Sequence, residues 1–178
     1  DFKLVIESKY PADNKVKITF AEANQSERKV SLRIPAFSAK NTKICINGKL
    51  HPIDNLGTES FYLPINKVWA KGDVIEIEFD MNPHIVRPCG VEGKDNTKDY
   101  FAVIYGPLVL ARDAQITQVG NSVKLSDKLE VVPKDKEGFD CVFRANVFLG
   151  NEEMDMIDYS SAGKTWDDSS LTEAWIKC

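Results

Sequence analysis

Aromatic side chains are the residues of this chain whose types are best suited to binding chemistry. Trp69, Trp166 and Tyr62, together with Trp175 and Tyr159, could offer flat rings on which the apolar face of a sugar stacks. Packing in a core or against another domain is the more common role of such rings. We take Trp69, Trp166 and Tyr62 as the candidate carbohydrate-binding residues and keep packing as the alternative.

Catalytic and metal-binding patterns are weak in comparison. The sequence has no Gly-x-Ser-x-Gly elbow, no Cys-x-x-Cys pair and no Gly-rich phosphate loop before a helix. His84 and Cys89 lie near Glu92, but a strand-end histidine beside an unrelated thiol is the simpler interpretation. The carboxylate pair of a glycosidase meets only in space, and the acidic residues here mostly alternate along strands or occupy turns. We therefore predict no catalytic residue and no metal site.

The elements that would position these side chains are strands. Apolar and polar residues alternate in residues 2–6, 15–20, 30–34 and 74–80, as in strands with one buried and one solvated face. Asn47-Gly48 is a strong signal for a two-residue hairpin. The chain is therefore predicted to be all-β, an antiparallel, jelly-roll-like β-sandwich that could carry a small appended β subdomain.

The second half of the chain shows a less regular pattern. Residues 101–105 and 108–110 form a nearly continuous apolar stretch, which predicts a strand covered on both faces and bent at Gly106-Pro107. We treat residues 1–178 as one sandwich region, with the main sandwich in about residues 1–112 and further strands in residues 113–178. Those further strands are expected at residues 116–119, 129–132, 141–148 and 154–159, and residues 90–99 are expected to form a long loop.

Composition excludes several classes of function. The chain has 178 residues, a net charge of −4 and a pI of about 5.3, with no Lys/Arg stripe, so we expect no nucleic-acid partner. The longest apolar run, residues 101–111, is too short to span a membrane. Four cysteines are too few for a disulfide framework in a chain of this size and are interpreted as buried or surface thiols.

Several segments in a fixed order resemble one enzyme family. They are Leu-Arg-Ile-Pro-Ala-Phe at 32–37, Ile-Asn-Gly at 46–48, Trp-x-x-Gly-Asp at 69–73, residues 81–87, Ala-Val-Ile-Tyr-Gly-Pro-Leu-Val-Leu-Ala at 102–111, and Ile-Asp-Tyr-Ser-Ser-Ala-Gly-Lys-Thr-Trp at 157–166. In this order they resemble the region that follows the catalytic barrel in glycoside hydrolase family 127, the β-L-arabinofuranosidase family.

The resemblance implies a role without catalysis in this chain. Family 127 enzymes are similar to one another in a large helical barrel, where a zinc-bound cysteine is the nucleophile and a glutamate the acid/base. The corresponding Glu and paired-Cys motif is missing from this sequence. We therefore expect a non-catalytic accessory domain that packs against the barrel and shapes the rim of its active site. No cofactor is expected here, and zinc is expected only in the barrel.

Two other functions stay open at this stage. One is a carbohydrate-binding module that recognises plant or microbial polysaccharide, and the other is a glycosidase that acts alone. The expected partners are the catalytic barrel and, in the module alternative, polysaccharide. Family analogy places the protein in the periplasm or outside the cell.

Overall fold

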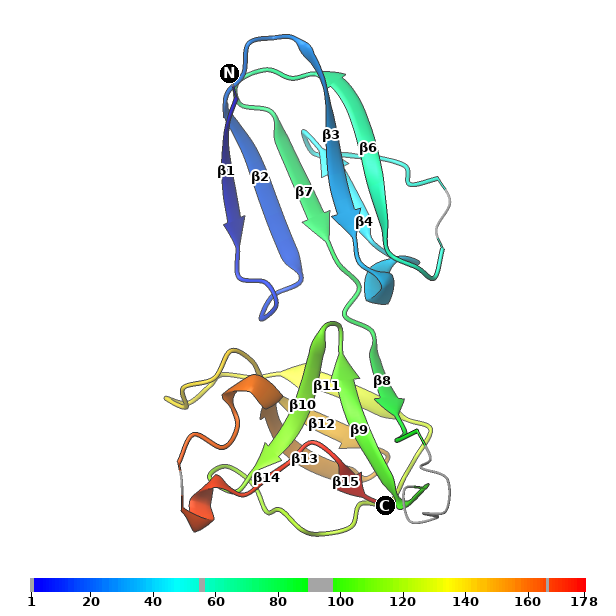
Figure 1. Ribbon diagram of the computed structural model, residues 1–178, viewed down its shortest axis with the longest axis vertical. Helices are drawn as coiled ribbons and strands as arrows, with labels where there is room; N and C mark the ends of the chain where they lie inside the picture. Colours follow the sequence, from blue (N-terminus) through cyan, green and yellow to red (C-terminus); the bar gives the residue numbers. More distant parts are fainter. Residues whose placement is uncertain (1, 55–56, 90–97, 166) are drawn as a thin grey trace. The chain divides into compact units, whose positions relative to one another are not determined.

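The structure, a computed structural model, describes residues 2–54, 57–89, 98–165 and 167–178. The chain forms two compact units, Asp1–Asn82 and Pro83–Cys178, which we describe separately (Figure 1). The all-β prediction is confirmed, because every paired strand is antiparallel and the described residues contain no α-helix. The sequence placed the end of the main sandwich near residue 112, a position that lies inside a strand of the second unit.

The first unit is a sandwich of two unequal sheets. The second sheet pairs β3 (Glu27–Ile34) with β6 (Phe61–Val68). The first sheet has five strands in the order β1 (Lys3–Ser8), β2 (Lys15–Glu22), β7 (Val74–Glu78), β4 (Lys43–Ile46) and β5 (Lys49–Leu50). The alternating segments of the sequence correspond to β1, β2, β3 and β7. Strand β6 was not predicted, although its burial alternates along its length, and Pro64 stands at an exposed position of a strand that has one free edge.

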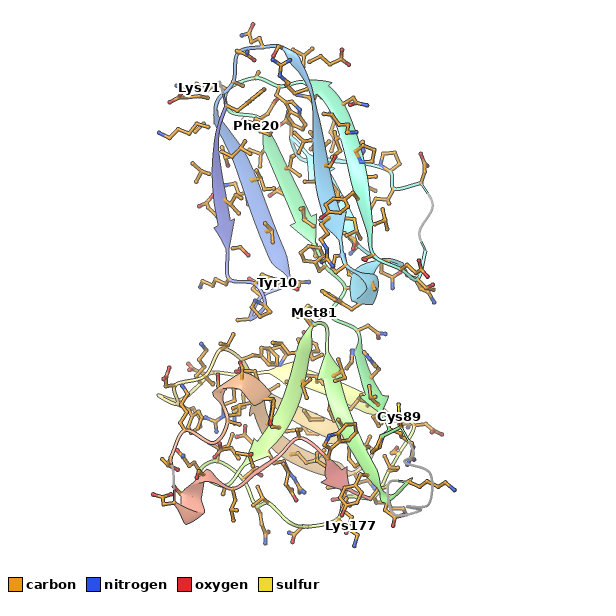
Figure 2. The ribbon with its side chains drawn as sticks, viewed as in Figure 1. Tyr10, Phe20, Lys71, Met81, Cys89 and Lys177 are labelled. Carbon is orange, nitrogen blue, oxygen red and sulfur yellow. The ribbon has the colours of Figure 1, made fainter. Side chains whose placement is uncertain are left out.

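Trp69 belongs to the core between these sheets. Its side chain is fully buried and its ring stacks on Phe20, with centroids 4.3 Å apart and an interplanar angle of 6°. The indole N–H donates to the carbonyl oxygen of Arg28 at 3.1 Å. Figure 2 shows Phe20 among the side chains between the sheets. A buried Trp with a satisfied N–H is the arrangement that large core aromatics favour.

The turn that follows Trp69 is tied to the hairpin between β4 and β5. The Asp73 carboxylate accepts the Ala70 N–H at 2.9 Å, the Lys67 ammonium, and the Asn47 side-chain amide at 2.7 Å. The predicted hairpin at Asn47-Gly48 is confirmed, and both of its residues adopt positive φ, 52° and 74°. One carboxylate therefore fixes two turns at the same end of the sheet.

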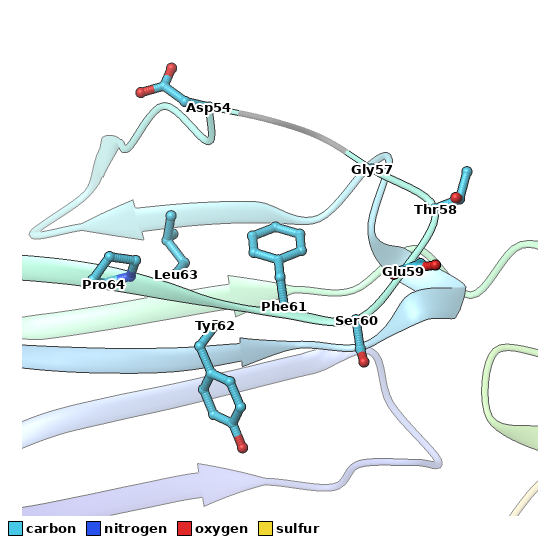
Figure 3. Close-up of a pocket in the computed structure, with 9 residues that line it drawn as sticks. All are labelled: Asp54, Gly57, Thr58, Glu59, Ser60, Phe61, Tyr62, Leu63 and Pro64. Carbon is cyan, nitrogen blue, oxygen red and sulfur yellow. The ribbon is translucent and has the colours of Figure 1, made fainter.

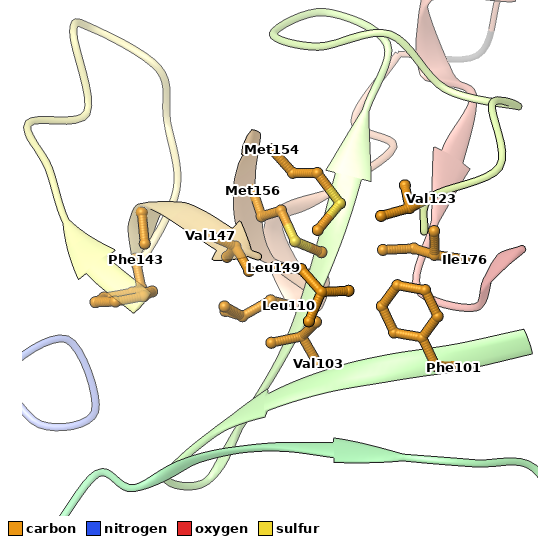
Figure 4. Packing of buried hydrophobic residues seen from close by; sticks show 11 residues of the cluster. Phe101, Val103, Leu110, Val123, Phe143, Val147, Leu149, Met154, Met156 and Ile176 are labelled. Carbon is orange, nitrogen blue, oxygen red and sulfur yellow. The ribbon is translucent and has the colours of Figure 1, made fainter. Parts of the chain in front are cut away.

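The second unit is built around one sheet of eight strands. Two short strands lie off its main path: β14 (Thr172–Glu173) pairs with β10, and β8 (Pro83–Val86) pairs with β9. The main order is β11 (Leu129–Pro133), β12 (Arg144–Leu149), β13 (Glu152–Asp158), β10 (Leu108–Asp113), β9 (Tyr100–Tyr105) and β15 (Ile176–Lys177). Its core includes Phe101, Leu110, Met156 and Ile176 (Figure 4).

The apolar stretch around Gly106-Pro107 differs from its prediction. It forms a tight hairpin, with Tyr105 directly opposite Leu108, and not one bent strand. Gly106 has a φ of 55° and stands at the first turn position, where two-residue hairpins of one common type carry Gly. The apolar run continues through the turn because both strands contribute to the core, so the alternation that marks a hairpin is hidden.

The strand predicted at residues 116–119 is wrong. The Asp113 carboxylate accepts the Gln115 N–H at 2.9 Å, and the Asp113 carbonyl oxygen accepts the N–H groups of Ile116 and Thr117. These local hydrogen bonds hold a turn in place of a strand ladder. The predictions at 129–132 and 154–159 correspond to β11 and β13, and the one at 141–148 corresponds to β12, which begins at Arg144. Most of the loop predicted at 90–99 lies outside the described residues.

The C-terminal segment closes the sheet of the second unit. Strands β9 and β10 diverge from their hairpin, and the segment that carries β14 and β15 lies across the open end (Figure 1). Glu173 lies opposite Arg112 on β10, and Ile176 lies opposite Phe101 on β9. Ile176 is fully buried, so this segment contributes to the core as well as to the ladder.

Replacing Trp69 by Ala is expected to destabilise the first unit by about 3–5 kcal/mol, because a large fully buried ring is removed. Urea denaturation followed by circular dichroism measures the effect. Leu50→Ala is the matched control, since Leu50 is 71% exposed on β5 and should change stability by less than about 0.5 kcal/mol. Equal effects of the two substitutions would contradict the central role of Trp69.

Candidate functional site

The three candidate sugar-binding residues differ in how the structure places them. Trp69 is buried and stacked on Phe20, so neither face of its ring is available to a sugar, and its predicted binding role is not compatible with its position. Trp166 lies outside the described residues. Tyr62 is 66% exposed and keeps an accessible ring. Of the two described rings, Trp69 is buried in the core and Tyr62 is exposed, so these two do not form one site.

Tyr62 lies on the outer face of the two-stranded sheet. It stands directly opposite Arg33 of β3, and directly opposite residues of antiparallel strands share a face. Figure 3 shows the Tyr62 ring pointing to the opposite side of β6 from Phe61 and Leu63, which pack against the core. The guanidinium of Arg33 and the phenol of Tyr62 together supply hydrogen-bond donors next to an apolar ring.

A groove of about 560 Å³ lies along the start of β6, between this strand and the segment that leads into it (Figure 3). Phe61 and Leu63 point toward the segment that carries Asp54, while Tyr62 points away from it. The remaining polar lining comes from Thr58, Glu59 and Ser60. Tyr62 is also among the residues that line the groove, although its ring points to the opposite side of β6 from Phe61 and Leu63.

Other aromatic side chains are exposed in the second unit. Tyr159 is 56% exposed at the end of β13, and Trp175 is 47% exposed between β14 and β15. Both were among the rings considered from the sequence, and both stay accessible.

The cysteines of this chain are not joined in disulfides. Cys45, Cys89, Cys141 and Cys178 are free thiols. Within residues 2–54, 57–89, 98–165 and 167–178, no group of three or more His, Cys, Asp or Glu side chains could hold a metal ion. Burial raises the pKa of the Cys141 thiol, which disfavours the thiolate that binds metals.

The carboxylates with shifted pKa values serve as structural acceptors. Burial alone would raise the pKa of Asp155, but hydrogen bonds from Arg144 and Lys134 outweigh it and lower the pKa. Asp73 behaves in the same way through Lys67 and the Ala70 N–H. A glycosidase needs one carboxyl group whose pKa is raised, so that it stays protonated and can donate to the leaving group. Each described Asp whose pKa is shifted has it lowered by hydrogen bonds or nearby cations, so none of these five is a protonated carboxyl group of that kind.

Asp158 is the most completely engaged of these acceptors. It is 1% exposed and accepts the N–H groups of Val142 and Phe143, both at 2.9 Å. The hydroxyl groups of Ser160 and Ser161 donate to its other oxygen at 2.6 and 2.8 Å. Burial alone would raise the pKa of Asp158, but these four hydrogen bonds outweigh burial and lower it. The segment around residues 157–166 that the resemblance singled out is therefore organised by a buried anion.

Comparison with known proteins identifies the first unit. Residues 1–81 match the family model described as "Beta-L-arabinofuranosidase, GH127 middle domain". The resemblance to family 127 is confirmed. The matched domain is the middle domain of these proteins, which refines its expected place after the barrel. A search of curated proteins gave no match.

Solved structures extend the likeness to both units. A protein titled "Glycoside hydrolase" superposes with a TM-score of 0.76 and 19% identity, over 99% of this chain and 32% of that one. A GH127 beta-L-arabinofuranosidase from Geobacillus stearothermophilus T6 superposes with a TM-score of 0.73 and 18% identity, over 99% of this chain and 30% of that one. The GH127 beta-arabinofuranosidase BT3674 superposes with a TM-score of 0.70 and 20% identity, over 99% of this chain and 31% of that one. This chain thus shares its fold with about a third of the length of each.

No helix in the described part of the chain is long and apolar enough to cross a membrane.

The buried carboxylate of Asp158 is expected to make the stability of the second unit depend on pH. Its pKa is lower in the folded than in the unfolded state, so its contribution to stability is present above the unfolded-state pKa of about 3.9 and is lost as pH falls through the folded value. Asp158→Asn should destabilise the second unit by about 1.5–3 kcal/mol at neutral pH, and should flatten the fall in stability below about pH 4.

Urea denaturation at neutral pH and near pH 3 measures both effects. The control is Asp127→Asn, which alters an exposed carboxylate of the same unit. A variant at Asp158 that kept the full acid dependence of the parent chain would show that another group carries it.

Proposed function

We propose that this chain is a non-catalytic accessory portion of a GH127-like glycoside hydrolase, which packs against the catalytic helical barrel and shapes the rim of its active site. The observation that carries the proposal is the superposition of 99% of this chain on about a third of each GH127 structure. The other two thirds of such a protein provide room for a catalytic domain. The match of residues 1–81 to the GH127 middle domain independently supports the GH127 part of this proposal.

The chemistry of the described residues supports a non-catalytic role for this chain and a catalytic role for the barrel. Their shifted carboxylates are ionised acceptors in turns and ion-pair networks, and their cysteines are scattered. We propose that the zinc-bound cysteine and the acid/base glutamate of the family belong to the barrel. By family analogy, we also place the complete enzyme in the periplasm or outside the cell, where it would act on plant or microbial polysaccharide.

The isolated chain is expected to show no hydrolysis of a chromogenic β-L-arabinofuranoside, with or without added zinc, because its described residues offer neither the nucleophile nor a protonated acid. The assay should be repeated after mixing with the catalytic portion of its own GH127 protein, produced as a separate chain. Activity and a 1:1 complex in the mixture are expected. Turnover by the 178-residue chain alone would contradict the proposal.

Direct contact with carbohydrate through Tyr62 is a second candidate function. It is favoured by one observation: Tyr62 is the candidate ring that stays exposed, and Arg33 lies directly opposite it on the same face. An exposed ring beside a charged hydrogen-bond donor is suited to a sugar, which presents an apolar face and hydroxyl groups. The accessory role and sugar contact are compatible, because the second would direct polysaccharide toward the barrel.

Tyr62→Ala is expected to weaken binding of an arabinose-containing oligosaccharide by about tenfold, as judged by calorimetric titration, because the stacking surface is lost. Tyr62→Phe keeps the ring and should keep most of the affinity. Val68→Ala is the matched control, since Val68 is 53% exposed on the same strand. Equal binding by the parent chain and the Tyr62→Ala variant would exclude Tyr62 as a sugar platform.

A further inference from the structure

The hairpin turn between β4 and β5 carries a reactive pair of residues, Asn47 and Gly48. An asparagine followed by glycine is the pair in which the backbone attacks the side chain most readily, because glycine has no Cβ to shield its nitrogen. The nitrogen of Gly48 bonds to the Cγ carbon of Asn47, and the bond from this carbon to the side-chain NH2 group breaks. That group takes up the proton of the Gly48 nitrogen and leaves as ammonia. Water then opens the cyclic imide to an aspartate or an isoaspartate.

Water has access to this turn. Asn47 and Gly48 are both exposed, so water can reach the imide that cyclisation forms. A Cβ atom added to Gly48 would meet nothing within 4 Å, so no neighbouring side chain is packed on this residue. Asn47 is also the one asparagine of the sequence that glycine follows, so the sequence favours the reaction here over every other asparagine.

Hydrogen bonds hold the side-chain amide of Asn47 in the folded hairpin. Its Nδ2 donates to the Asp73 carboxylate at 2.7 Å, and its Oδ1 accepts the Val74 N–H at 2.8 Å. The backbone N–H of Asn47 donates to the carbonyl oxygen of Val74 at 2.9 Å. Cyclisation requires the Cγ carbon to move to the Gly48 nitrogen, and this movement breaks both side-chain hydrogen bonds. The exposed amide is therefore protected by its contacts and not by burial.

The carboxylate that binds this amide is fixed in its turn by the core. Asp73 is 9% exposed and accepts the Ala70 N–H at 2.9 Å as well as the Lys67 ammonium. Its carbonyl oxygen accepts the Phe20 N–H at 2.9 Å, and Phe20 stacks on Trp69. The Asp73 carboxylate therefore cannot move away from the hairpin without disturbing the core of the first unit.

The products of the reaction cannot replace Asn47 in this arrangement. An aspartate has no Nδ2 donor, and at neutral pH it places a second negative charge within hydrogen-bond distance of the Asp73 carboxylate. An isoaspartate also lengthens the backbone by one carbon atom, which does not fit the two-residue turn between Ile46 and Lys49. Ile46 lies opposite Ile75 and packs against the core, so loss of the turn also weakens the attachment of β4.

We propose that Asn47 is a spontaneous modification site that is protected only while the first unit is folded. In the closed hairpin, Asp73 and Val74 hold the amide, and cyclisation is slow. Each opening of the hairpin frees the amide to react with the Gly48 nitrogen, and the acidic product opposes closure, so the modification favours the open state. The chain therefore carries a chemical limit on its lifetime, which is independent of the accessory role and of sugar binding.

Peptide mapping by mass spectrometry tests the protection, using the 178-residue chain in mildly alkaline buffer with and without urea. In urea, Asn47 is expected to be converted faster than any other asparagine, and Gly48→Ala should slow its conversion because a Cβ then shields the nitrogen. Without urea, conversion of Asn47 should be slower by about tenfold or more, because the hairpin must open first. Equal rates in the two conditions would overturn the proposal, as would slower conversion of Asn47 than of Asn121 in urea.

The substitution Asn47→Asp reproduces one product and tests its effect on the fold. Urea denaturation is expected to show a ratio of folded to unfolded chain about tenfold lower than in the parent, because a donor is lost and two carboxylates face one another. Asn24→Asp is the matched control, since it makes the same change of charge at an exposed position between β2 and β3. It should change the ratio by less than about twofold. Equal effects of the two substitutions would contradict the proposal.

A double-mutant cycle with Asp73→Asn assigns the effect to this pair of residues. Asn47→Asp should cost less in the Asp73→Asn background than in the parent chain, because the facing carboxylate is gone and the new amide can donate to the new carboxylate. An equal cost in both backgrounds would overturn the proposed opposition of charges. The comparison with and without urea needs only the parent chain, so it stands whatever Asp73→Asn does to the fold. The hydrolase assay is separate, and the accessory role would stand or fall without these results.

Discussion

The sheet that covers the five-stranded sheet of the first unit has only two strands in the described part of the chain, and most features of that unit follow from this difference in width. Sheets pack face to face so that each buries one surface, and a narrow sheet can bury only the strands directly beneath it. The bulky pair of Phe20 and Trp69 fills the space where cover is complete. Beyond it, burial decreases across β2 and is lost at β1. A surface that would be core in a symmetric sandwich is therefore exposed at β1.

Buried carboxylates take the place of helix caps and disulfides in organising the turns. Asp73 joins two turns of the first unit, and Asp158 holds four donors at the end of β13. Asp113 accepts the N–H groups of Gln115 and Gly163, each at 2.9 Å, and so links segments far apart in the sequence. A buried anion is costly unless its donors are complete, which makes each of these sites specific for one backbone arrangement. The acidic residues that might suggest catalysis are therefore used to hold the loops.

Sequence reasoning succeeded where one face of a strand is buried and the other is wet. Alternation located β1, β2, β3 and β7, and Asn47-Gly48 located a hairpin, because local pattern and local turn chemistry determine those features. It failed at the hairpin of β9 and β10, where both strands are apolar throughout, and at residues 116–119, where turn hydrogen bonds prevailed over strand propensity. Whether Trp69 and Tyr62 are buried or exposed depends on which face of each sheet is covered. Pairing between strands that are distant in the sequence decides this. No local pattern contains that information.

The crossing of β14 and β15 over the diverging ends of β9 and β10 bears on how the protein is made. The first unit has all of its strands once residue 82 has left the ribosome, and it can fold while the remainder is still being translated. The second unit has no such freedom, since Ile176 completes a core that Phe101 began. Its apolar strands stay exposed until the later segment that carries Ile176 has been synthesised. The nascent second unit is thus the stage of biogenesis at which chaperones would be most needed, however stable the finished molecule becomes.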